Sequence, residues 1–442
     1  MNQSLEQMAA TIDEPYVGPV QGKERFSSID VVRGVALFGI LLINIIWFGH
    51  GMGAIEFTTG EGAVGANFWA WVVEYTFFEG TQRLLFSLLF GAGVIILTSR
   101  AEERGGGIKV ADIYYRRNLW LFAFGMIDSY LLLWEGDILY YYGLAALFLF
   151  PLRNMKAKHL LLAGLACLSI LVAERQYDAN QTREQHSDYA EAQAVLATGA
   201  ELDEEQQEAF DGWEKELKGA KFNADEHEEM LEAMTTSYWT AFMHNVPFLT
   251  RMHGYVTYRF IFLDVLSIML IGMALLKMGV LTLQKPTRFY YLLMLAGYGI
   301  GLPVSIWEVN HVVSNDFALL SLVDISWSYD LGRLAMGTGH LALLLLFVNS
   351  GIMMWLQDRL AAVGRMALTN YIFHSVICAI IFKGVGFGLF GYFERYELYY
   401  VVAIICLFQL LISKIWLDKY RFGPLEWLWR SLTYLKNQPM KR

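Results

Sequence analysis

Long apolar runs separated by short polar segments form the dominant pattern of this chain. Ten of these runs contain few or no charged residues: Val31–Phe48, Leu84–Leu97, Leu119–Trp134, Ile138–Pro151, Leu160–Ala173, Phe260–Leu276, Phe289–Trp307, Leu341–Leu356, Ala367–Phe382 and Leu398–Ile412. A helix needs roughly 20 residues to cross the ~30 Å apolar core of a bilayer, so several runs need flanking Gly, Trp or Tyr residues to complete a span. The alternating pattern of a membrane β-barrel is absent. The pattern therefore predicts an all-α, polytopic membrane helical bundle with about ten transmembrane helices.

One apolar segment, Phe68–Gly80, does not fit this scheme because it carries Glu74 and Glu79. Counting it as a span would invert the sidedness of every later loop. We expect instead an interfacial or re-entrant helix that breaks at residues 79–83, before the span from Leu84. Irregular backbone survives at membrane depth only where it lines a protein cavity, so this break indicates a functional site nearby.

The composition agrees with a lipid environment, since 55% of the residues are hydrophobic and only 17% are charged, against about 25% charged in soluble proteins. The net charge of −9 is unevenly distributed. Residues 174–232 hold 18 Asp and Glu against 5 Lys and Arg, which leaves 25 acidic and 29 basic residues for the rest of the chain. The helical spacing of Phe210, Trp213 and Leu217, with a capping pattern at 223–226, predicts that this acidic insertion is helical.

The basic residues predict that the insertion is extracytoplasmic, because Lys and Arg accumulate in short cytoplasmic loops. Of the 34 Lys and Arg, 23 fall on one side of the predicted topology, in the segments 23–33, 100–117, 153–158, 277–288, 359–365 and 414–442. We therefore expect a multi-pass protein of the bacterial inner membrane with both termini in the cytoplasm. The predicted organisation is a cytoplasmic tail at 1–26, a first helical bundle at 27–173, the extracytoplasmic insertion at 174–235, a second bundle at 236–421 and a cytoplasmic tail at 422–442.

Several function classes lack their sequence signatures. Cys167, Cys378 and Cys406 lie far apart in apolar runs, which predicts buried apolar side chains rather than a disulfide or a zinc site. His186 and His227 stand alone on a solvated acidic surface, so we expect no metal there. There is no phosphate-binding loop, nucleophile elbow or dinucleotide fingerprint, and no basic footprint for nucleic acid. We expect no bound cofactor.

Ionisable side chains inside predicted spans are expensive and usually face a cavity or a partner. Asp30 and Arg33 share one face of the first helix, where they either bind substrate or form an interfacial pair that sets the topology. Asn44, deeper in the same helix, is either a positioned hydrogen-bonding group or a contact between helices. Glu79 and Arg83 lie four residues apart at the predicted break and form either a substrate site or a structural ion pair.

Three more places carry polar residues at or near membrane depth. Asp137 lies at the outer end of a tight predicted hairpin, where a turn or helix-capping role competes with substrate binding. Arg333 and His340, seven residues apart, share one helix face and would both face the interior. His340 is either a functional residue or a hydrogen-bonded core residue. Asn370 and His374, four residues apart, share another face, which predicts either a ligand-filled pocket or polar packing between helices.

Five segments resemble the YeiB-like family of bacterial membrane proteins, which is defined by a domain of unknown function. These segments are Ser28–Asn44, Leu85–Gly93, Gly136–Leu139, Gly364–Tyr371 and Phe422–Arg430. The resemblance covers nearly the whole chain outside the acidic insertion. The last two segments are together the most specific, and on them the chain is identified as a member of this family.

The first helix, with Asp30-x-x-Arg33 followed by Asn44, is also similar to that of a wider group of transmembrane acyltransferases, which includes the lysosomal heparan-α-glucosaminide N-acetyltransferase. This likeness implies an enzyme that takes an acyl group from a cytoplasmic donor of the acyl-CoA type and delivers it to an extracytoplasmic acceptor. Members of the YeiB-like family often have His where Asp128 stands and Gln where His374 stands. No single catalytic base therefore carries over from the family.

Acyl transfer requires a general base near the acceptor hydroxyl and groups that polarise the thioester carbonyl. The candidate catalytic residues are His374, His50, His340 and Asn44. The candidate substrate-binding residues are Asp30, Arg33, Glu79, Arg83, Asp137, Arg333 and Asn370. The basic residues expected to meet the phosphates of the donor are Arg33, Arg116, Arg117 and Arg365.

The alternative function is a small-molecule or lipid transporter or channel without acyl-transfer chemistry, in which the break at 79–83 forms a discontinuous helix. A scaffold or sensing role built on the acidic insertion is a third hypothesis. The expected partners are membrane lipids, an acyl donor and an extracytoplasmic acceptor. No nucleic acid is expected, and the sequence leaves a homo-oligomer open.

Overall fold

A computed structural model describes residues 26–51, 65–103, 105–220 and 223–442. Within these ranges the chain is helical, and the only extended pairing is one bridge between Tyr420 and Lys441. The predicted all-α class is confirmed.

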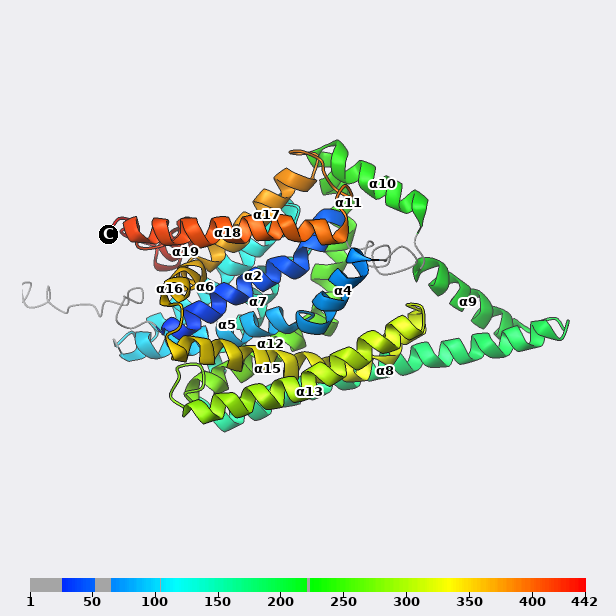
Figure 1. The fold of residues 1–442 in the computed structure, drawn as a ribbon, viewed down its shortest axis with the longest axis horizontal. Coiled ribbons are helices and arrows are strands. Elements are labelled where there is room, and N and C mark those ends of the chain that lie inside the picture. The colour runs from blue at the N-terminus through cyan, green and yellow to red at the C-terminus, as the bar shows by residue number, and fades with distance from the viewer. Residues whose placement is uncertain (1–25, 52–64, 104, 221–222) are drawn as a thin grey trace, which may run out of the picture.

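The elements that build the membrane part run from α2 to α8 and from α11 to α19, with α9 and α10 between them (Figure 1). In chain order they are α2 (Ser27–His50), α4 (Ala66–Phe77), α5 (Thr81–Glu103), α6 (Lys109–Met126), the π-helix η3 (Ile127–Leu131), α7 (Leu139–Ala146), the short 3-10 helix η4 (Phe150–Leu152), α8 (Ala157–Ala197), α9 (Glu204–Ala220), α10 (Ala224–Thr236), α11 (Tyr238–Arg251), the π-helix η5 (Met252–Ile261), α12 (Phe262–Lys277), α13 (Thr287–Ser314), α14 (Leu319–Asp324), α15 (Ser326–Ser350), α16 (Met354–Arg365), α17 (Ala367–Phe382), α18 (Arg395–Lys419) and α19 (Pro424–Tyr434).

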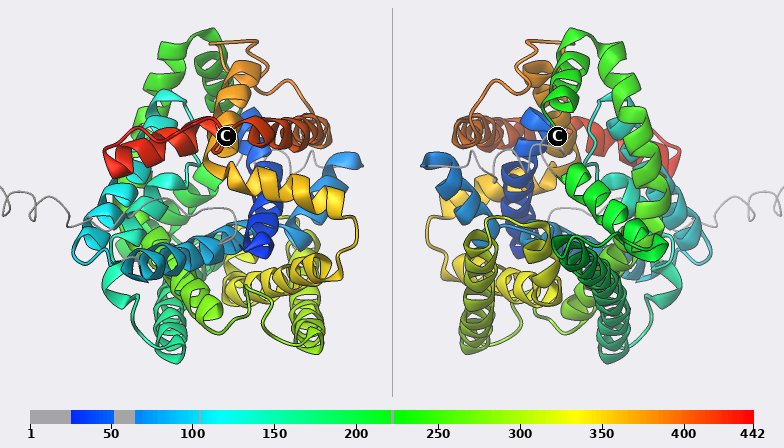
Figure 2. Two further views of the ribbon diagram at one scale, coloured as in Figure 1. Left: turned by 90° about the vertical axis from the view of Figure 1, so that its left-hand side faces the viewer. Right: turned by 90° about the vertical axis from the view of Figure 1, so that its right-hand side faces the viewer.

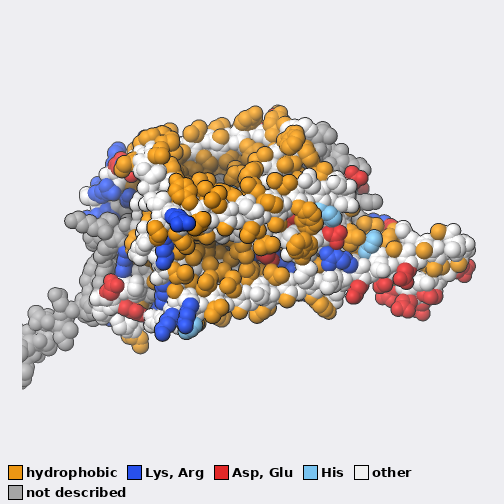
Figure 3. All heavy atoms as spheres, turned by 60° about the horizontal axis from the view of Figure 1, so that its bottom comes forward, with side chains coloured by type: hydrophobic (Ala, Val, Ile, Leu, Met, Phe, Trp, Pro, Cys, Tyr) orange, Lys and Arg blue, Asp and Glu red, His pale blue; other side chains and the backbone are white. Residues whose placement is uncertain are grey.

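Helix α2 is the centre of the bundle. Its side chains Leu37, Leu41 and Ile45 are fully buried, and Figure 2 shows the helix surrounded by the others when the bundle is viewed end-on. Apolar side chains cover much of the outer face shown in Figure 3, as lipid contact requires, and acidic side chains gather on the arm that protrudes from one end. The arrangement is that of a multi-pass membrane protein.

Among the described residues, seven helical stretches are long and apolar enough to cross a membrane, or eight if the bent pair α16 and α17 forms one broken span. The predicted count of ten is not confirmed. The difference lies in the runs Leu119–Trp134 and Ile138–Pro151, which form the end of α6, η3 and α7. Helix α7 has only 8 residues, so at 1.5 Å per residue it extends roughly 12 Å, well short of the bilayer core.

An interruption lies close to the break predicted at residues 79–83, but it covers only residues 78–80, and α4 and α5 together form one of the stretches long enough to cross a membrane, so the predicted interfacial or re-entrant helix is not confirmed. Helix α4 ends at Phe77, α5 begins at Thr81, and Gly80 between them has φ +66°. That left-handed conformation favours glycine, which explains why the turn occurs here. The predicted span Leu341–Leu356 is wrong in its bounds, because α15 runs from Ser326 to Ser350 and stops at Gly351, which is also left-handed.

Helix α8 is continuous over 41 residues and carries the chain from the bundle into the acidic arm. The predicted start of the insertion at residue 174 therefore falls inside one helix. Helix α9 packs back on α8 through Tyr189, whose ring centroid lies 5.2 Å from that of Phe210, and Trp213 is buried beside them. The predicted helix start at 223–226 is confirmed, because the Asn223 side chain accepts hydrogen bonds from the backbone nitrogens of Asp225 and Glu226.

Small residues allow the closest helix contacts. A Cβ atom placed on Gly91 of α5 would lie 2.0 Å from the carbonyl oxygen of Met269 in α12, and one on Gly272 of α12 would lie 2.0 Å from that of Leu88 in α5. The two backbones are thus in direct contact, which is how helices associate in lipid, where apolar side chains gain little by leaving the tails.

A candidate ligand cavity lined by arginines

A cavity of ≈ 260 Å³ lies between α2, α5, α6, α7, α16, α17 and α19. Five arginines line it, and each comes from a different helix: Arg33, Arg100, Arg117, Arg365 and Arg430. The acidic side chains in its wall are Asp30 and Glu426. The cavity therefore carries an excess of positive charge and suits an anionic group.

The remaining wall of the cavity is mainly apolar and aromatic. It includes Phe86, Leu89 and Phe90 of α5, Leu121 of α6 and Leu139 of α7. A ligand that fits both parts has a negatively charged group at one end and an apolar group at the other.

Two of the segments that resemble the YeiB-like family meet beside this cavity. A Cβ atom on Gly364 would lie 2.0 Å from the carbonyl oxygen of Asp30, and one on Gly34 would lie 2.2 Å from that of Leu360. This close crossing of α2 and α16 brings Arg33 and Arg365 to the cavity wall. Arg33 also pairs with Asp30 at 3.1 Å, so the predicted interaction within the first helix is present.

Helix α19 forms another part of the wall. The carboxylate of Glu426 accepts hydrogen bonds from the backbone nitrogen of Thr369 at 3.0 Å and from its hydroxyl at 2.6 Å. Burial raises the pKa of Glu426, while these hydrogen bonds oppose the shift. Three residues further along, on the same face of the helix, the ring centroid of Trp429 lies 3.5 Å from the Arg117 guanidinium. The C-terminal segment predicted as a tail thus contains a helix that is fixed to the bundle through one buried face.

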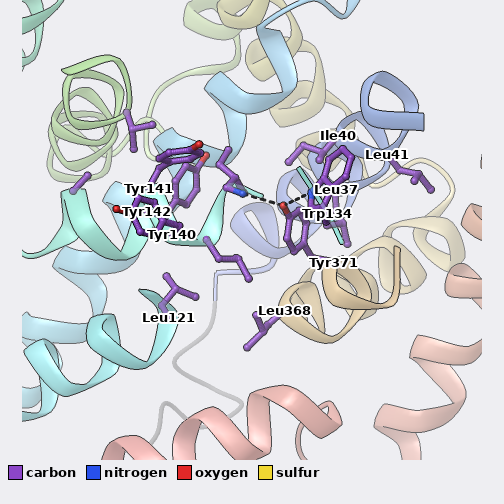
Figure 4. Packing of buried hydrophobic residues seen from close by; sticks show 14 of the residues in the cluster. Leu37, Ile40, Leu41, Leu121, Trp134, Tyr140, Tyr141, Tyr142, Leu368 and Tyr371 are labelled. Carbon is purple, nitrogen blue, oxygen red and sulfur yellow. Dashed lines mark hydrogen bonds between the residues drawn. The ribbon is translucent and has the colours of Figure 1, made fainter. Parts of the chain in front are cut away.

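Tyr371 of α17 lines the cavity, and Figure 4 shows its hydroxyl group directed at Trp134. Its hydroxyl oxygen accepts hydrogen bonds from the indole nitrogen of Trp134 at 3.1 Å and from the backbone nitrogen of Ile138 at 3.0 Å. The hydroxyl donates to Oδ1 of Asp137 at 3.4 Å, and Oδ2 of Asp137 accepts from the backbone nitrogen of Tyr140 at 2.8 Å. The two N–H donors fix the phenol oxygen in place and leave its own proton directed at Asp137.

Of the basic residues expected to meet donor phosphates, Arg33, Arg117 and Arg365 line the cavity. Arg116 does not, because its guanidinium pairs with Asp112 and donates to the carbonyl oxygen of Thr433. Among the predicted substrate-binding residues, Asp30 and Arg33 lie in the cavity wall and Asp137 lies directly behind Tyr371.

Three predicted residues belong to a second, separate cluster. Arg333 forms ion pairs with Asp264 and with Asp330, the latter at 2.6 Å. Arg83 lies 3.3 Å from Asp264, and Glu79 accepts a hydrogen bond from Tyr329 at 2.9 Å. Sequence reasoning missed Asp264 because it lies within an apolar run, where its partners come from other helices.

The histidines proposed as bases lie outside this cavity. His340 is held between the carbonyl oxygen of Phe77 at 2.7 Å and the hydroxyl of Tyr298 at 3.0 Å. His374 lies 3.0 Å from the side-chain oxygen of Gln409 in α18. His50 is buried at the opposite end of α2 from Arg33.

The two predicted asparagines also lie away from the cavity wall. Asn370 donates to the hydroxyl of Ser413 at 3.1 Å and to the carbonyl oxygen of Val363 at 3.2 Å. Asn44 is half-buried in α2. Within the described residues, no group of three or more His, Cys, Asp or Glu is arranged to hold a metal ion.

Comparison with known proteins gives the following matches. A family described as "Protein of unknown function (DUF418)" matches residues 275–436. The "Uncharacterized protein YeiB" of Escherichia coli is 30% identical over 93% of this chain and 96% of its own length. The "Uncharacterized protein YxaH" of Bacillus subtilis is 28% identical over 96% of this chain and 98% of its own length. No solved structure matches.

The matched region contains Arg365, Tyr371, Glu426 and Arg430 of the cavity. Tyr371 and Glu426 were not among the predicted site residues, although both lie in the segments that carried the resemblance. Their place in those segments could have marked them as candidates. Only the tertiary structure shows that the two side chains line the same cavity.

Proposed function

We propose that this chain, which belongs to the YeiB-like family of proteins of unknown function, is a membrane-bound acyltransferase whose cavity receives an acyl donor of the acyl-CoA type. The observation that carries the proposal is the joining of five arginines and an apolar wall in one cavity. Arginine is the side chain best suited to phosphates, which it binds with paired hydrogen bonds. The acyl chain of the donor would lie against the phenylalanines and leucines.

The size of the cavity supports an arrangement in which only part of the donor is enclosed. Its volume of ≈ 260 Å³ lies below the ~300–1,000 Å³ of pockets that enclose a drug-sized ligand. We therefore place the acyl chain and thioester inside and the nucleotide at the arginines. This placement requires the arginine-bearing end to face the cytoplasm, where acyl-CoA is made, and it agrees with the charge-based topology.

Tyr371 and Asp137 are the groups proposed to handle the proton. In the reaction, an acceptor hydroxyl attacks the thioester carbonyl carbon, a C–O bond forms and the C–S bond breaks. The acceptor proton passes to the Tyr371 oxygen, in place of one of its two N–H donors, as the phenol proton moves to Asp137. The proton then returns by the same route through Tyr371 to the leaving thiolate, which becomes the free thiol. Proton transfer of this kind contributes roughly 10²–10⁴-fold to rate.

The first experiment measures donor binding by purified full-length protein in detergent, with CoA and acetyl-CoA as probes. Replacing Arg117 or Arg365 with Gln should weaken binding roughly tenfold to a hundredfold, because hydrogen bonds to charged groups contribute about 1.5–3 kcal/mol. The matched control is Arg183→Gln, because Arg183 pairs with Asp324 at a half-exposed site outside the cavity. This variant should bind CoA as the wild type does.

The second experiment measures chemistry, as hydrolysis of labelled acetyl-CoA or acylation of the protein itself. Tyr371→Phe should keep CoA affinity and lower the rate. Absence of CoA binding, hydrolysis and self-acylation, together with solute uptake in proteoliposomes, would favour the transporter alternative and reject the proposal.

A further inference from the structure

Two carboxyl groups meet in the interior behind Tyr371. Asp128 lies in the π-helix η3, and Asp137 lies in the loop that follows; they are 0% and 1% exposed. Gly125 makes this approach possible, since a Cβ atom there would lie 2.5 Å from Oδ2 of Asp137 and 2.2 Å from the backbone nitrogen of Tyr140. π-Helical turns are rare and concentrate at functional sites, because they displace one residue from the regular helix.

No cationic side chain in the described part of the chain pairs with either carboxyl group. Asp128 and Asp137 lie close enough to influence each other electrostatically, and both influence Tyr371 of α17. Asp137 also influences Tyr141 of α7. Among the described residues, no Lys, Arg or His forms a salt bridge with either carboxyl group. Two buried carboxylates in contact cannot both be ionised at ordinary cost, because desolvation and like-charge repulsion act in the same direction.

The hydrogen-bonding pattern distinguishes the two groups. Asp137 receives bonds from Tyr371 and from the backbone nitrogen of Tyr140, so its negative charge is stabilised. Within the described residues, neither oxygen of Asp128 has a hydrogen-bond partner at normal distance, and the hydroxyl of Ser375 has none either. The ionised form of Asp128 is thus less well stabilised than that of Asp137.

We propose that Asp128 and Asp137 form a proton-binding site that holds one proton in the resting protein and connects to the cavity through Tyr371. With one proton the pair carries a single negative charge on Asp137, and it can accept one more proton through the Tyr371 hydroxyl. A proton released in the cavity therefore has a place to go without a buried charge being created. The role of this site in acyl transfer rests on the proposed function, but the resting proton does not.

A polar contact between two π-helices lies next to Asp128 in the chain. The hydroxyl of Ser129, next to Asp128, lies 3.4 Å from Nε2 of His253 in the second π-helix, η5. The ring of His253 stacks on that of Tyr140 with centroids 4.1 Å apart. Two π-helices thus contact each other at this point.

The test is infrared spectroscopy of the purified full-length protein without donor, in H₂O and D₂O. The spectrum of the wild type minus that of Asp128→Asn, in which the bands of other buried acids such as Glu426 cancel, should show the carbonyl stretch of a buried protonated carboxyl group at neutral pH, with slow deuterium shift. Asp128→Asn should lose this band and keep its thermal midpoint, because Asn has the shape and neutrality of the protonated acid. The control Asp324→Asn, at a half-exposed ion pair, should leave the band unchanged.

Absence of the band in the wild type, or its persistence in both Asp128→Asn and Asp137→Asn, would overturn the proposal. A thermal midpoint that rises with Na⁺ in the wild type but not in Asp128→Asn would assign the pair to a cation instead and would also overturn it. Because the measurement needs no donor, a protein that fails to bind CoA but shows the band would reject the acyltransferase function while retaining the proton site.

Discussion

The carboxylate of Glu426 accepts two hydrogen bonds from Thr369, one from its backbone N–H at 3.0 Å and one from its hydroxyl at 2.6 Å. Thr369 is the third residue of α17, so Glu426 satisfies a backbone donor that the first turn of a helix leaves without a partner. The same carboxylate lies in the cavity wall. Helix α19 therefore supplies a hydrogen-bond acceptor for the first turn of α17 and also forms part of the cavity wall.

Replacing Glu426 with Ala should destabilise the protein by about 1–3 kcal/mol, because the buried N–H of Thr369 would lose its acceptor. Glu426→Gln retains one acceptor oxygen and should cost less. The thermal midpoint of both variants in detergent checks this prediction. Equal losses in the two variants would show that packing, rather than the hydrogen bond, is responsible.

The pH dependence of stability should carry the signature of Glu426. Burial raises the pKa of this carboxyl group, so the folded state retains a proton that the unfolded state has already released. This contribution to stability is present below the usual pKa of glutamate and is lost as pH rises through the raised pKa. Denaturation measured from acidic to neutral pH should therefore show less decline with pH in Glu426→Gln than in the wild type.

Replacing Gly91 with Ala should destabilise the crossing of α5 and α12 by about 1–3 kcal/mol, because the new methyl group would overlap the carbonyl oxygen of Met269. The matched control is Gly93→Ala in the same helix, where no atom lies within 4 Å of the added Cβ. Ala is the better helix former, so Gly93→Ala should be neutral or slightly stabilising. Similar losses in both variants would contradict the close contact.

Replacing Arg333 with Leu should destabilise the protein by about 3–5 kcal/mol, because Asp264 and Asp330 would remain buried without their main partner. The comparison is Arg183→Ala, which breaks a half-exposed pair with Asp324 and should cost about 0–1 kcal/mol. Thermal denaturation of both variants compares their losses of stability. Losses of similar size would show that the Arg333 cluster is not shielded from water.

Replacing His374 with Gln should leave stability and CoA binding close to the wild type, since a Gln amide can still donate to Gln409. His374→Leu should cost about 1–3 kcal/mol, because the oxygen of Gln409 lies 3.0 Å from the imidazole and would lose that partner. A large loss of acetyl-CoA hydrolysis in His374→Gln, with normal stability, would return His374 to the list of catalytic bases.

Parts of the candidate site could be predicted because neighbouring residues in the chain carry them. Asp30 and Arg33 are three residues apart in a helix, so their pairing follows from helical geometry alone. Arg117 and Arg365 were expected to meet a phosphate because they lie at the basic ends of apolar runs, and both line the cavity.

Contacts between distant segments could not be predicted in this way. His340, His374 and Asn370 were candidates because they are polar in apolar helices, yet their hydrogen bonds go to Tyr298, Gln409 and Ser413. Each partner lies at least 35 residues away in the chain or on another helix. A single sequence without the fold does not say whether such a residue faces a cavity or a polar neighbour.

The apolar runs and the charge pattern by themselves determined that this chain is helical, that it is built for a membrane, and that an acidic segment stands apart from the bundle. They do so because backbone groups in lipid must bond within their own helix, and that requirement acts locally along the chain. Tertiary structure alone decided that two runs fold back as α6, η3 and α7, and that arginines from five helices surround one cavity. It also decided that Asp128 meets Asp137 behind Tyr371. Those relationships depend on which helix faces pack together, and packing joins residues that the order of the chain keeps apart.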